Sequence, residues 1–316
     1  MNPAASILVQ MVRDTGRAIA SEWDIFLLAR QLFLERGYRG TPIPPRNRHL
    51  SARRARKLLS EATWDPTYAL GGQPPSDRLI RDKDFQSLLY TVCDGDAAQV
   101  MLDADPFCYL SHASALAVHR LAPETSKLQV STPERGLWSA QARAEMTAAL
   151  GFELEDADED DLPFSLTRPQ PHAQIRGMTV HRHETRTPLS RDQLGPGPIR
   201  VTPIGVSFRD TLAAPGWCGG MPAMVELWRT HATSHRDAII EAIAASDEKI
   251  VRVRAGYLLQ EMLGIEDPRI DAWVSDAQRG GSRKLDPSAP YAPRFSARWM
   301  LSINVDDAAL PATTLG

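Results

Sequence analysis

The 316-residue chain has few of the features that mark secreted or membrane proteins. Its three cysteines, Cys93, Cys108 and Cys218, lack metal-ligand spacing and are odd in number, which argues against a disulfide framework and fits a reducing cytoplasm. No apolar run approaches the ~20 residues that a membrane-spanning helix needs. The first twenty residues carry charges within their apolar stretch rather than before it, unlike a secretory signal. We therefore expect a cytoplasmic protein that does not contact a membrane.

A second absence is local, because no Asp or Glu occurs in the 22 residues from Arg36 to Lys57. The same window holds eight basic side chains, although the whole chain has a formal net charge of only −3. They are Arg36, Arg39, Arg46, Arg48, Arg53, Arg54, Arg56 and Lys57. A cluster this dense is a natural phosphate binder, since binding releases condensed counterions. The window favours contact with a nucleic acid over the alternative of a solvated helix face.

The residues around this window indicate two helices. Apolar side chains in residues 21–36 follow helical spacing, with Ser21 as the N-cap and Gly37 closing the helix. Ser51 is placed to cap a second helix, from Ala52 to about Ala62, with Leu58 and Leu59 facing a core. The basic side chains spread over the remaining faces of this second helix.

The segments that flank the second helix complete a recognisable order. Three prolines between Thr41 and Pro45 predict a connector rather than helix. Two short strands are expected at residues 78–80 and 87–92, around Asp82-Lys83-Asp84. Helix, connector, basic helix and two-stranded ribbon follow one another in the order of a winged helix-turn-helix.

The predicted DNA contacts fall into three groups. Side chains before the second helix would meet phosphates, as would the backbone N–H of Ser51 at the helix N-terminus. Arg53, Arg54 and Lys57 would enter the major groove, where arginine can pair with guanine. The ribbon would supply wing contacts, although its basic residues alternate with acids and leave it nearly neutral. The full predicted set is Arg46, Arg48, Ser51, Arg53, Arg54, Arg56, Lys57, Arg78, Arg81 and Lys83.

The second half of the chain mixes helix and strand patterns. Strands are expected at residues 174–183, 199–204 and 297–305, and helices at 94–104, 113–121, 210–213, 221–231, 234–245 and 249–263. Eight acids and no base occur between Glu145 and Asp161, and we expect most of this run to lie in a solvated loop. The expected fold class is therefore mixed α/β (α+β), with a winged helix-turn-helix domain at residues 1–105 and a mixed α/β domain at 106–316.

Four collinear stretches carry a family resemblance. They are Tyr109-Leu110-Ser111-His112-Ala113-Ser114-Ala115-Leu116; Phe208-Arg209-Asp210-Thr211-Leu212 with Pro215 and Gly219-Gly220; Arg254-Ala255-Gly256-Tyr257-Leu258-Leu259; and Leu285-Asp286-Pro287 with Trp299 and Asn304. They resemble successive segments of the AbiEi family, the antitoxins of type IV toxin–antitoxin (abortive infection) systems. Arg120 stands where that family usually has Gly, and the Asp210-Thr211 order also departs from its pattern.

The resemblance implies a non-enzymatic protein of phage defence that represses its own operon. In such a protein the N-terminal winged helix binds double-stranded operator DNA at inverted repeats, which favours a homodimer on DNA. The C-terminal domain supplies the antitoxin function and helps cooperative binding. The cognate toxin would be a nucleotidyltransferase-like protein, and no cofactor or metal is implied.

Other interpretations of the sequence remain open. The chain could be a defence nuclease whose C-terminal domain uses a metal held by paired carboxylates. It could also be an interaction protein whose basic segment binds an acidic partner. Arg252 and Arg254, on one expected helix, could bind DNA or the toxin, or they could be structural salt-bridge partners. His181 and His183 would share a strand face as metal ligands must, but ordinary surface histidines explain them better.

Overall fold

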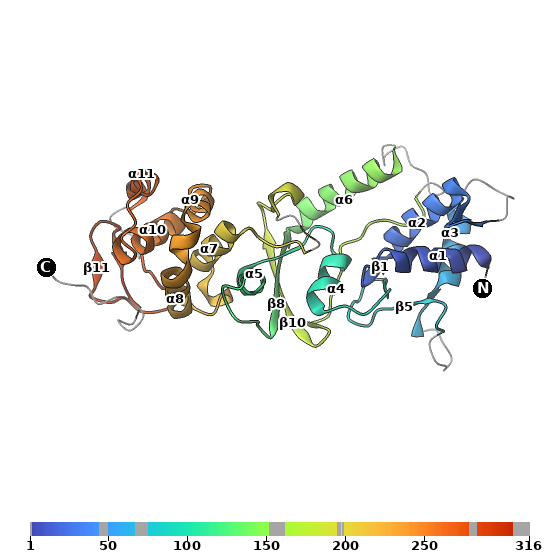
Figure 1. The fold of residues 1–316 in the computed structure, drawn as a ribbon, viewed down its shortest axis with the longest axis horizontal. Helices are drawn as coiled ribbons and strands as arrows, with labels where there is room; N and C mark the ends of the chain where they lie inside the picture. The colour runs from blue at the N-terminus through green and yellow to red at the C-terminus, as the bar shows by residue number, and fades with distance from the viewer. Residues whose placement is uncertain are drawn as a thin grey trace. The chain divides into compact units, whose positions relative to one another are not determined.

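The computed structural model describes residues 2–43, 50–66, 75–151, 162–194, 197, 199–277 and 283–305. It is a mixed α/β structure, which confirms the predicted fold class. The chain forms two compact units (Figure 1): the N-terminal unit, Met1–Cys108 with Ser131–Pro188, and the C-terminal unit, Tyr109–Val130 with Leu189–Gly316. The first boundary lies close to the division expected after residue 105, but residues 131–188 group with the N-terminal residues.

The first part of the N-terminal unit is a small helical bundle with a sheet at its side (Figure 1). Its elements are α1 (Pro3–Asp14), β1 (Ile19–Ser21), α2 (Glu22–Glu35), β2 (Gly37–Tyr38), β3 (Thr41–Pro42), α3 (Ala52–Ala62), β4 (Thr63–Trp64), β5 (Leu79–Arg81) and β6 (Leu89–Thr91). The main sheet has the strand order β1-β6-β5-β4. Strand β6 pairs antiparallel with both β1 and β5, with Thr91 opposite Ile19 on one side and Ile80 on the other. Strand β4 pairs parallel with β5.

Local capping explains where α2 begins and ends. Ser21 and Asp24 form a capping box, in which each side chain accepts a hydrogen bond from the other residue's backbone N–H. The helix ends at Arg36, which is left-handed at φ 60°, whereas the sequence pattern had assigned the closing role to Gly37. Gly37 instead starts the β2–β3 hairpin, where a Cβ would lie 2.5 Å from the carbonyl oxygen of Thr41. Glycine is needed there for close approach rather than for the helix cap.

Three helices enclose the core of this region. Leu8 and Val12 of α1, Leu32 of α2, and Leu58 and Leu59 of α3 are buried in one hydrophobic cluster. Each fully buried Leu stabilises the fold by about 1.5–3 kcal/mol relative to an exposed one. The inner face of α3 is therefore fixed by packing, and its orientation determines which of its side chains reach solvent.

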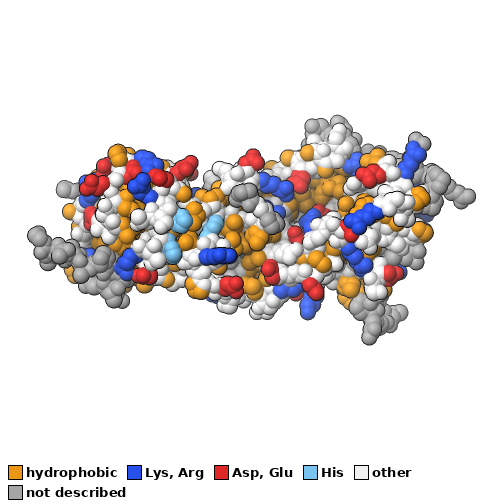
Figure 2. Space-filling view, in the orientation of Figure 1, with side chains coloured by type: hydrophobic (Ala, Val, Ile, Leu, Met, Phe, Trp, Pro, Cys, Tyr) orange, Lys and Arg blue, Asp and Glu red, His pale blue; other side chains and the backbone are white. Residues whose placement is uncertain are grey.

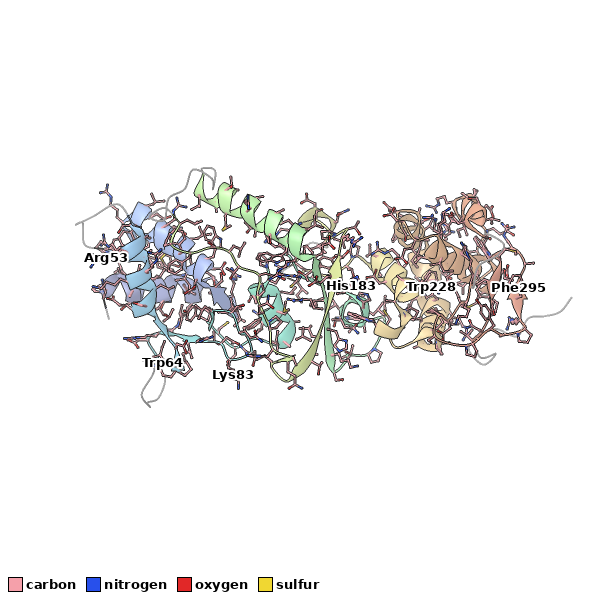
Figure 3. The ribbon with its side chains drawn as sticks, turned by 180° about the vertical axis from the view of Figure 1, so that it is seen from behind. Arg53, Trp64, Lys83, His183, Trp228 and Phe295 are labelled. Atoms are coloured by element: carbon pink, nitrogen blue, oxygen red, sulfur yellow. The ribbon has the colours of Figure 1, made fainter. Side chains whose placement is uncertain are left out.

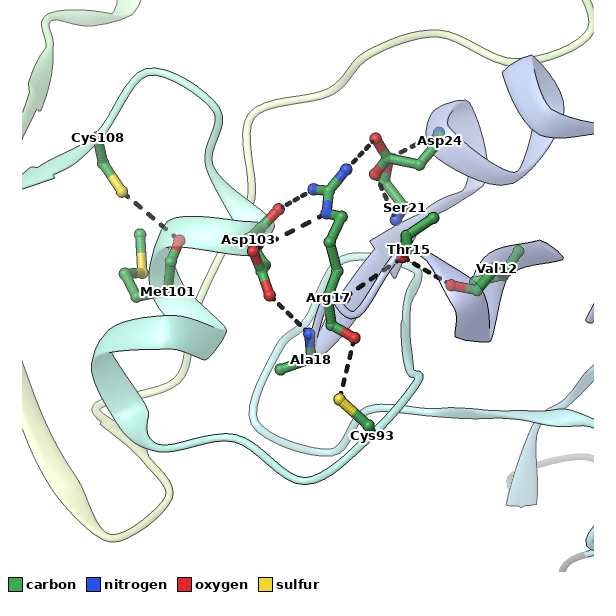
Figure 4. Close-up of polar contacts among 10 residues, drawn as sticks. All are labelled: Val12, Thr15, Arg17, Ala18, Ser21, Asp24, Cys93, Met101, Asp103 and Cys108. Carbon is green, nitrogen blue, oxygen red and sulfur yellow. Dashed lines mark hydrogen bonds and ion pairs between the residues drawn. The ribbon is translucent and has the colours of Figure 1, made fainter. Parts of the chain in front are cut away.

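The rest of the N-terminal unit contains α4 (Ala97–Ala104), α6 (Arg135–Leu150), and the β9 (Gln174–Ile175) and β10 (Met178–Thr185) hairpin. Arg17 ties α4 to the start of α2 (Figure 4): its guanidinium lies 2.7 Å from Asp24 and also donates to the carbonyl of Asp103. The Asp103 carboxylate accepts from the backbone N–H of Ala18 at 2.6 Å. This network fixes the chain that leads from α1 into β1.

The C-terminal unit is mainly helical. It contains β7 (Tyr109–Leu110), α5 (His112–Val118), α7 (Ile204–Ala213), α8 (Met221–His231), α9 (Arg236–Ala244), α10 (Lys249–Gly256), a π-helix (Tyr257–Met262), α11 (Pro268–Asp271), and the strands β11 (Phe295–Ser296) and β12 (Leu301–Ser302). Short 3-10 helices occupy Arg191–Gln193, Pro215–Trp217, Ala232–His235 and Ala272–Asp276. Strand β8 (Lys127–Pro133) spans the division of the chain, and the second four-stranded sheet has the order β7-β8-β10-β9.

The core of the C-terminal unit is packed around tryptophans. Phe208 meets the fully buried Trp228 edge-on, with ring centroids 5.3 Å apart. A Cβ on Gly256 would lie 2.1 Å from the ring of Trp299, so only glycine fits where α10 crosses that indole.

Two strands expected in the second half were wrong in detail. Residues 199–204 do not form the expected strand: they contribute one isolated β-bridge, between Val201 and Leu110, and α7 already begins at Ile204. Residues 297–305 are not one strand, since the chain turns between β11 and β12. Of the acidic run, Glu145 lies in α6, and residues 152–161, which hold the other seven acids, are outside the described residues. Among the described residues, no helix is both long and apolar enough to cross a membrane.

Candidate nucleic-acid interface

Helix α3 separates its apolar and basic side chains onto opposite faces. Ala52, Ala55, Leu58, Leu59 and Ala62 are buried. Arg53, Arg56, Lys57 and Ser60 are exposed, and their spacing of three and four residues places them on one outward face (Figure 3 labels Arg53). We call these four residues the basic face.

Basic side chains are visible on the surface of both units (Figure 2), so the charge of a side chain does not by itself single out a site. The basic face gathers three cations that have few partners on one face of one helix. Arg53 and Arg56 make no side-chain hydrogen bond or ion pair with any other residue that the structure describes. Lys57 remains 74% exposed and lies 3.9 Å from Glu61, an ion pair too loose and too solvated to hold it. The basic face therefore offers three cations to an external anion.

Arg54 has a different environment from its neighbours. Its guanidinium lies 4.5 Å from the ring centroid of Phe33 on α2, and the side chain is partly buried. A cation above an aromatic face contributes roughly 0.5–2 kcal/mol, depending on its exposure. Arg54 therefore helps join α2 to α3, which limits its reach toward the groove contact that the sequence predicted.

The N-terminus of α3 has backbone donors that its N-cap leaves unpaired. Ser51 is the N-cap residue, and its carbonyl accepts the first helical hydrogen bond from Ala55 at 2.9 Å. Its hydroxyl accepts no capping hydrogen bond. The Ser51 side chain therefore leaves the N–H groups of the first turn uncapped, at the helix end where the sequence predicts a phosphate contact. The predicted contacts Arg46 and Arg48 lie outside the described residues.

The three predicted contacts on the β5–β6 ribbon differ in their exposure and in their partners. Lys83, in the turn between the strands, is exposed and has no side-chain partner among the described residues (Figure 3). Arg78 is partly buried just before β5. Arg81 forms a 2.7 Å ion pair with Asp65 and donates to the carbonyl of Gln86 at 3.3 Å. Arg81 is thus engaged inside the unit, and its predicted role as a wing contact is not supported by its geometry.

Sequence analysis missed the residue that neutralises the acids of this turn. Arg176, between β9 and β10, lies 2.6 Å from the carboxylate of Asp82 and 2.5 Å from that of Asp84. Burial would raise the pKa of Asp82, but the hydrogen bonds and charge of Arg176, with further donors from Asp84 and Thr91, outweigh it and lower that pKa below its usual value. Asp82 is therefore charged at neutral pH, and Arg176 compensates it while also pairing with Asp84. No sequence spacing could reveal this contact, because 94 residues separate Arg176 from Asp82.

The two arginines of α10 have internal partners. Arg252 pairs with Asp276 at 2.5 Å and donates to the carbonyl of Ser246. Arg254 is only 6% exposed and donates to the carbonyls of Leu212 at 2.7 Å and Lys284 at 3.1 Å. Of the two roles that the sequence left open for this pair, these contacts support the structural one.

The described residues contain no group of three or more His, Cys, Asp or Glu side chains that could hold a metal ion. His181 and His183 lie on β10 at alternate positions of the strand.

Comparisons with known proteins give one structural similarity. No family model matches the chain, and no curated protein matches it. The crystal structure of the RV2827C protein from Mycobacterium tuberculosis is similar over 95% of this chain and 92% of that chain, with 12% identity and a TM-score of 0.44. A similarity of this size assigns neither a family nor a function.

Proposed function

We propose that the N-terminal unit is a winged helix-turn-helix that binds double-stranded DNA, and that the protein represses transcription of its own operon. The observation that carries the proposal is the basic face of α3: three outward cations lie opposite a buried apolar face. Cations in that arrangement attract the phosphate backbone and release its counterions.

The element order supports the same proposal. Helices α1, α2 and α3 are followed by β5 and β6, and β1 pairs with β6 on the side away from β5. In a winged helix, the second helix of the helix-turn-helix enters the major groove and the ribbon contacts backbone or minor groove. In this proposal, helix α3 is the helix that enters the major groove, and the β5–β6 turn is the ribbon that contacts the backbone or minor groove.

Each of the three cations of the basic face has a role in this proposal. Arg53 lies in the first turn of α3, where the N-terminal residues of a recognition helix reach base edges. Arg56 and Lys57 lie one turn further, where they contact phosphates on the rims of the groove. The backbone N–H groups of the first turn of α3, which the Ser51 side chain does not cap, bind a further phosphate. Base readout by Arg53 would discriminate one base pair by roughly 1–3 kcal/mol.

We also propose that the protein is an antitoxin, and this part of the proposal has a separate support. The four stretches that resemble the AbiEi family all lie in the C-terminal unit. In the proposed arrangement this unit counteracts a nucleotidyltransferase-like toxin, while the N-terminal unit regulates the operon. Co-expression with the toxin gene from the same operon tests this part. Cell growth should be rescued by the parent protein and equally by the Arg53→Ala variant, and an absence of rescue would contradict the antitoxin role.

DNA binding is tested by fluorescence anisotropy with a duplex from upstream of the protein's own gene. A scrambled duplex of equal composition measures non-specific binding. The variants Arg53→Ala, Arg56→Ala and Lys57→Ala each remove one positive charge from the basic face. Arg135→Ala is the matched control, because Arg135 is an exposed arginine on α6 of the same unit.

We expect each basic-face variant to bind more weakly than the control. Each lost phosphate contact should reduce the slope of log K against log salt concentration by about 0.9. Arg53→Ala should also reduce the preference for the operator over the scrambled duplex. Equal affinity and equal salt slope for Arg53→Ala, Arg56→Ala, Lys57→Ala and the Arg135→Ala control would overturn the proposal.

A further inference from the structure

The turn between β5 and β6 contains two acids that would repel a DNA backbone if they were left uncompensated. Asp82 is 3% exposed, and the Asp84 side chain is also largely enclosed. Lys83 lies between them in sequence and reaches solvent. With these three charges alone, the turn would carry a net charge of −1, the opposite of what a wing needs.

Arg176 supplies the missing positive charge from a distant segment of the same unit. Its Nη2 donates to Asp82 at 2.6 Å and its Nη1 to Asp84 at 2.5 Å, while its backbone N–H donates to the Asp84 carboxylate at 2.8 Å. One side chain thus bonds both acids, and the turn with Arg176 becomes neutral overall. Lys83 is then the one exposed charge among these four residues.

The backbone at Arg176 is held in an unusual conformation. Ile175 and Met178 pair across a two-residue turn, in which Arg176 has φ 48° and Gly177 has φ 80°. Positive φ at both central residues is the pattern of a type I′ hairpin, where Asn or Asp followed by Gly is preferred. A long side chain at the first position carries a conformational cost. The contacts that Arg176 makes with the two acids offset this cost.

The neighbouring chain anchors the β5–β6 turn as well. The backbone N–H of His172 donates to the carbonyl of Asp84, and the N–H of Gln86 donates to the carbonyl of Gln170, both at 2.8 Å. The N–H of Gln170 donates to the hydroxyl of Ser87 at 2.8 Å. The β5–β6 turn is therefore fixed in place by residues 170–176, so that Lys83 extends from a rigid base.

We propose that Arg176 is a positioning residue of the DNA-binding surface, which neutralises Asp82 and Asp84 and thereby lets Lys83 contact a phosphate. The inference rests on the proposed function and deepens it, because it makes the β9–β10 hairpin a part of the wing. Arg176 itself does not touch DNA, since its guanidinium is turned toward the two carboxylates.

The full chain and the operator duplex test this inference by anisotropy. Arg176→Ala should weaken binding by about five- to tenfold at 0.1 M salt, because two uncompensated negative charges would then lie in the turn that approaches the phosphates. The deficit should shrink as salt is added, since the repulsion is screened. The triple variant Arg176→Ala/Asp82→Asn/Asp84→Asn should recover most of the affinity, which a purely structural role for Arg176 would not allow.

Two milder variants keep the test valid if Arg176→Ala does not fold. Asp84→Asn retains the ion pair between Arg176 and Asp82 and adds one net positive charge, so it should bind the duplex at least as tightly as the parent. Lys83→Ala should lower the salt slope by about 0.9. Weaker binding by Asp84→Asn, or an unchanged slope for Lys83→Ala, would overturn the inference.

The outcomes separate this inference from the proposed function. If the basic-face variants lose affinity but Arg176→Ala binds like the parent, Arg176 has no such role and the DNA-binding proposal stands. If the triple variant binds as weakly as Arg176→Ala, the effect is not electrostatic and the inference fails. If the parent protein does not bind duplex DNA, both are overturned.

Discussion

Helices α3 and α10 each carry closely spaced arginines among apolar side chains, yet the two sets of arginines have opposite environments. In α3, Arg53 and Arg56 point outward with no partner among the described residues. In α10, Arg252 is paired with Asp276 and Arg254 is buried against two carbonyls.

The apolar positions of the two helices explain the difference. Buried residues of α3 recur at intervals of three and four, so one face stays open. In α10, Val251 and the four residues from Val253 to Gly256 are buried, so Arg254 lies inside the unit and Arg252 is partly buried. The spacing of apolar residues, more than the density of charge, therefore indicates whether an arginine is available to a ligand.

The largest effect that this comparison predicts is on stability at Arg254. Arg254→Ala would leave the carbonyls of Leu212 and Lys284 without their donor and would open a space inside the C-terminal unit. An unsatisfied buried acceptor costs about 1–3 kcal/mol, so we expect the free energy of unfolding to fall by about 3 kcal/mol. Urea denaturation measures it. Arg236→Ala is the matched control, since Arg236 is an exposed arginine of the same unit and should change stability by less than about 1 kcal/mol.

The second prediction concerns the ion pair between Asp82 and Arg176 in the N-terminal unit, and how its contribution to stability depends on pH. Asp82→Asn should lower the free energy of unfolding at pH 7 by about 2 kcal/mol, because a hydrogen bond between charged groups is lost. The folded pKa of Asp82 lies below the ordinary value of 3.8, so its contribution is complete above that value and is lost as the pH falls through the folded pKa. The difference between parent and variant should therefore be constant from pH 7 to about pH 5 and shrink below about pH 4. A difference that grows on acidification would show that Arg176 does not stabilise the charged form of Asp82.

The third prediction concerns a difference in role between Arg54 and Arg53, which both lie on α3. Arg54→Ala removes the cation above the Phe33 ring and should lower the free energy of unfolding by about 0.5–1 kcal/mol. Because that contact limits the reach of its side chain, the variant should change the salt slope of DNA binding less than Arg53→Ala does. Denaturation and anisotropy on the same preparations give both quantities. A larger loss of salt slope for Arg54→Ala than for Arg53→Ala would return Arg54 to the groove position that the sequence predicted.

Local signals in the sequence predicted a large part of the fold. Helix α2 has its capping box, and α3 has a regular apolar stripe, so both were located closely. Helix α1 was missed because its residues were considered only as a possible signal segment. Helix α6 was missed because its buried face is a narrow stripe of residues four apart, Trp138, Ala142, Met146 and Leu150, and its other faces mix alanine with polar and charged residues.

The candidate site was less accessible to sequence reasoning, because partners decide which charges remain available. Arg81 and Lys83 are both basic residues of the ribbon, but Asp65, sixteen residues away in sequence, pairs with Arg81. The two acids of the turn are compensated by Arg176, which is distant from them in sequence. Such pairings depend on tertiary contacts that periodicity and capping signals do not encode.

The smallest expected effect is on the stability of the basic-face variants. Arg53→Ala and Arg56→Ala remove side chains with no partner among the described residues, so the free energy of unfolding should change by less than about 0.5 kcal/mol. Alanine is also the better helix former, which offsets any small loss of packing by the arginine stems. Urea denaturation of both variants measures this change. The same samples should lose affinity for DNA, whereas the Arg236→Ala control should keep it. A basic-face variant as destabilised as Arg254→Ala would mean that these arginines support the fold, and a loss of DNA binding could then no longer be assigned to contact with DNA.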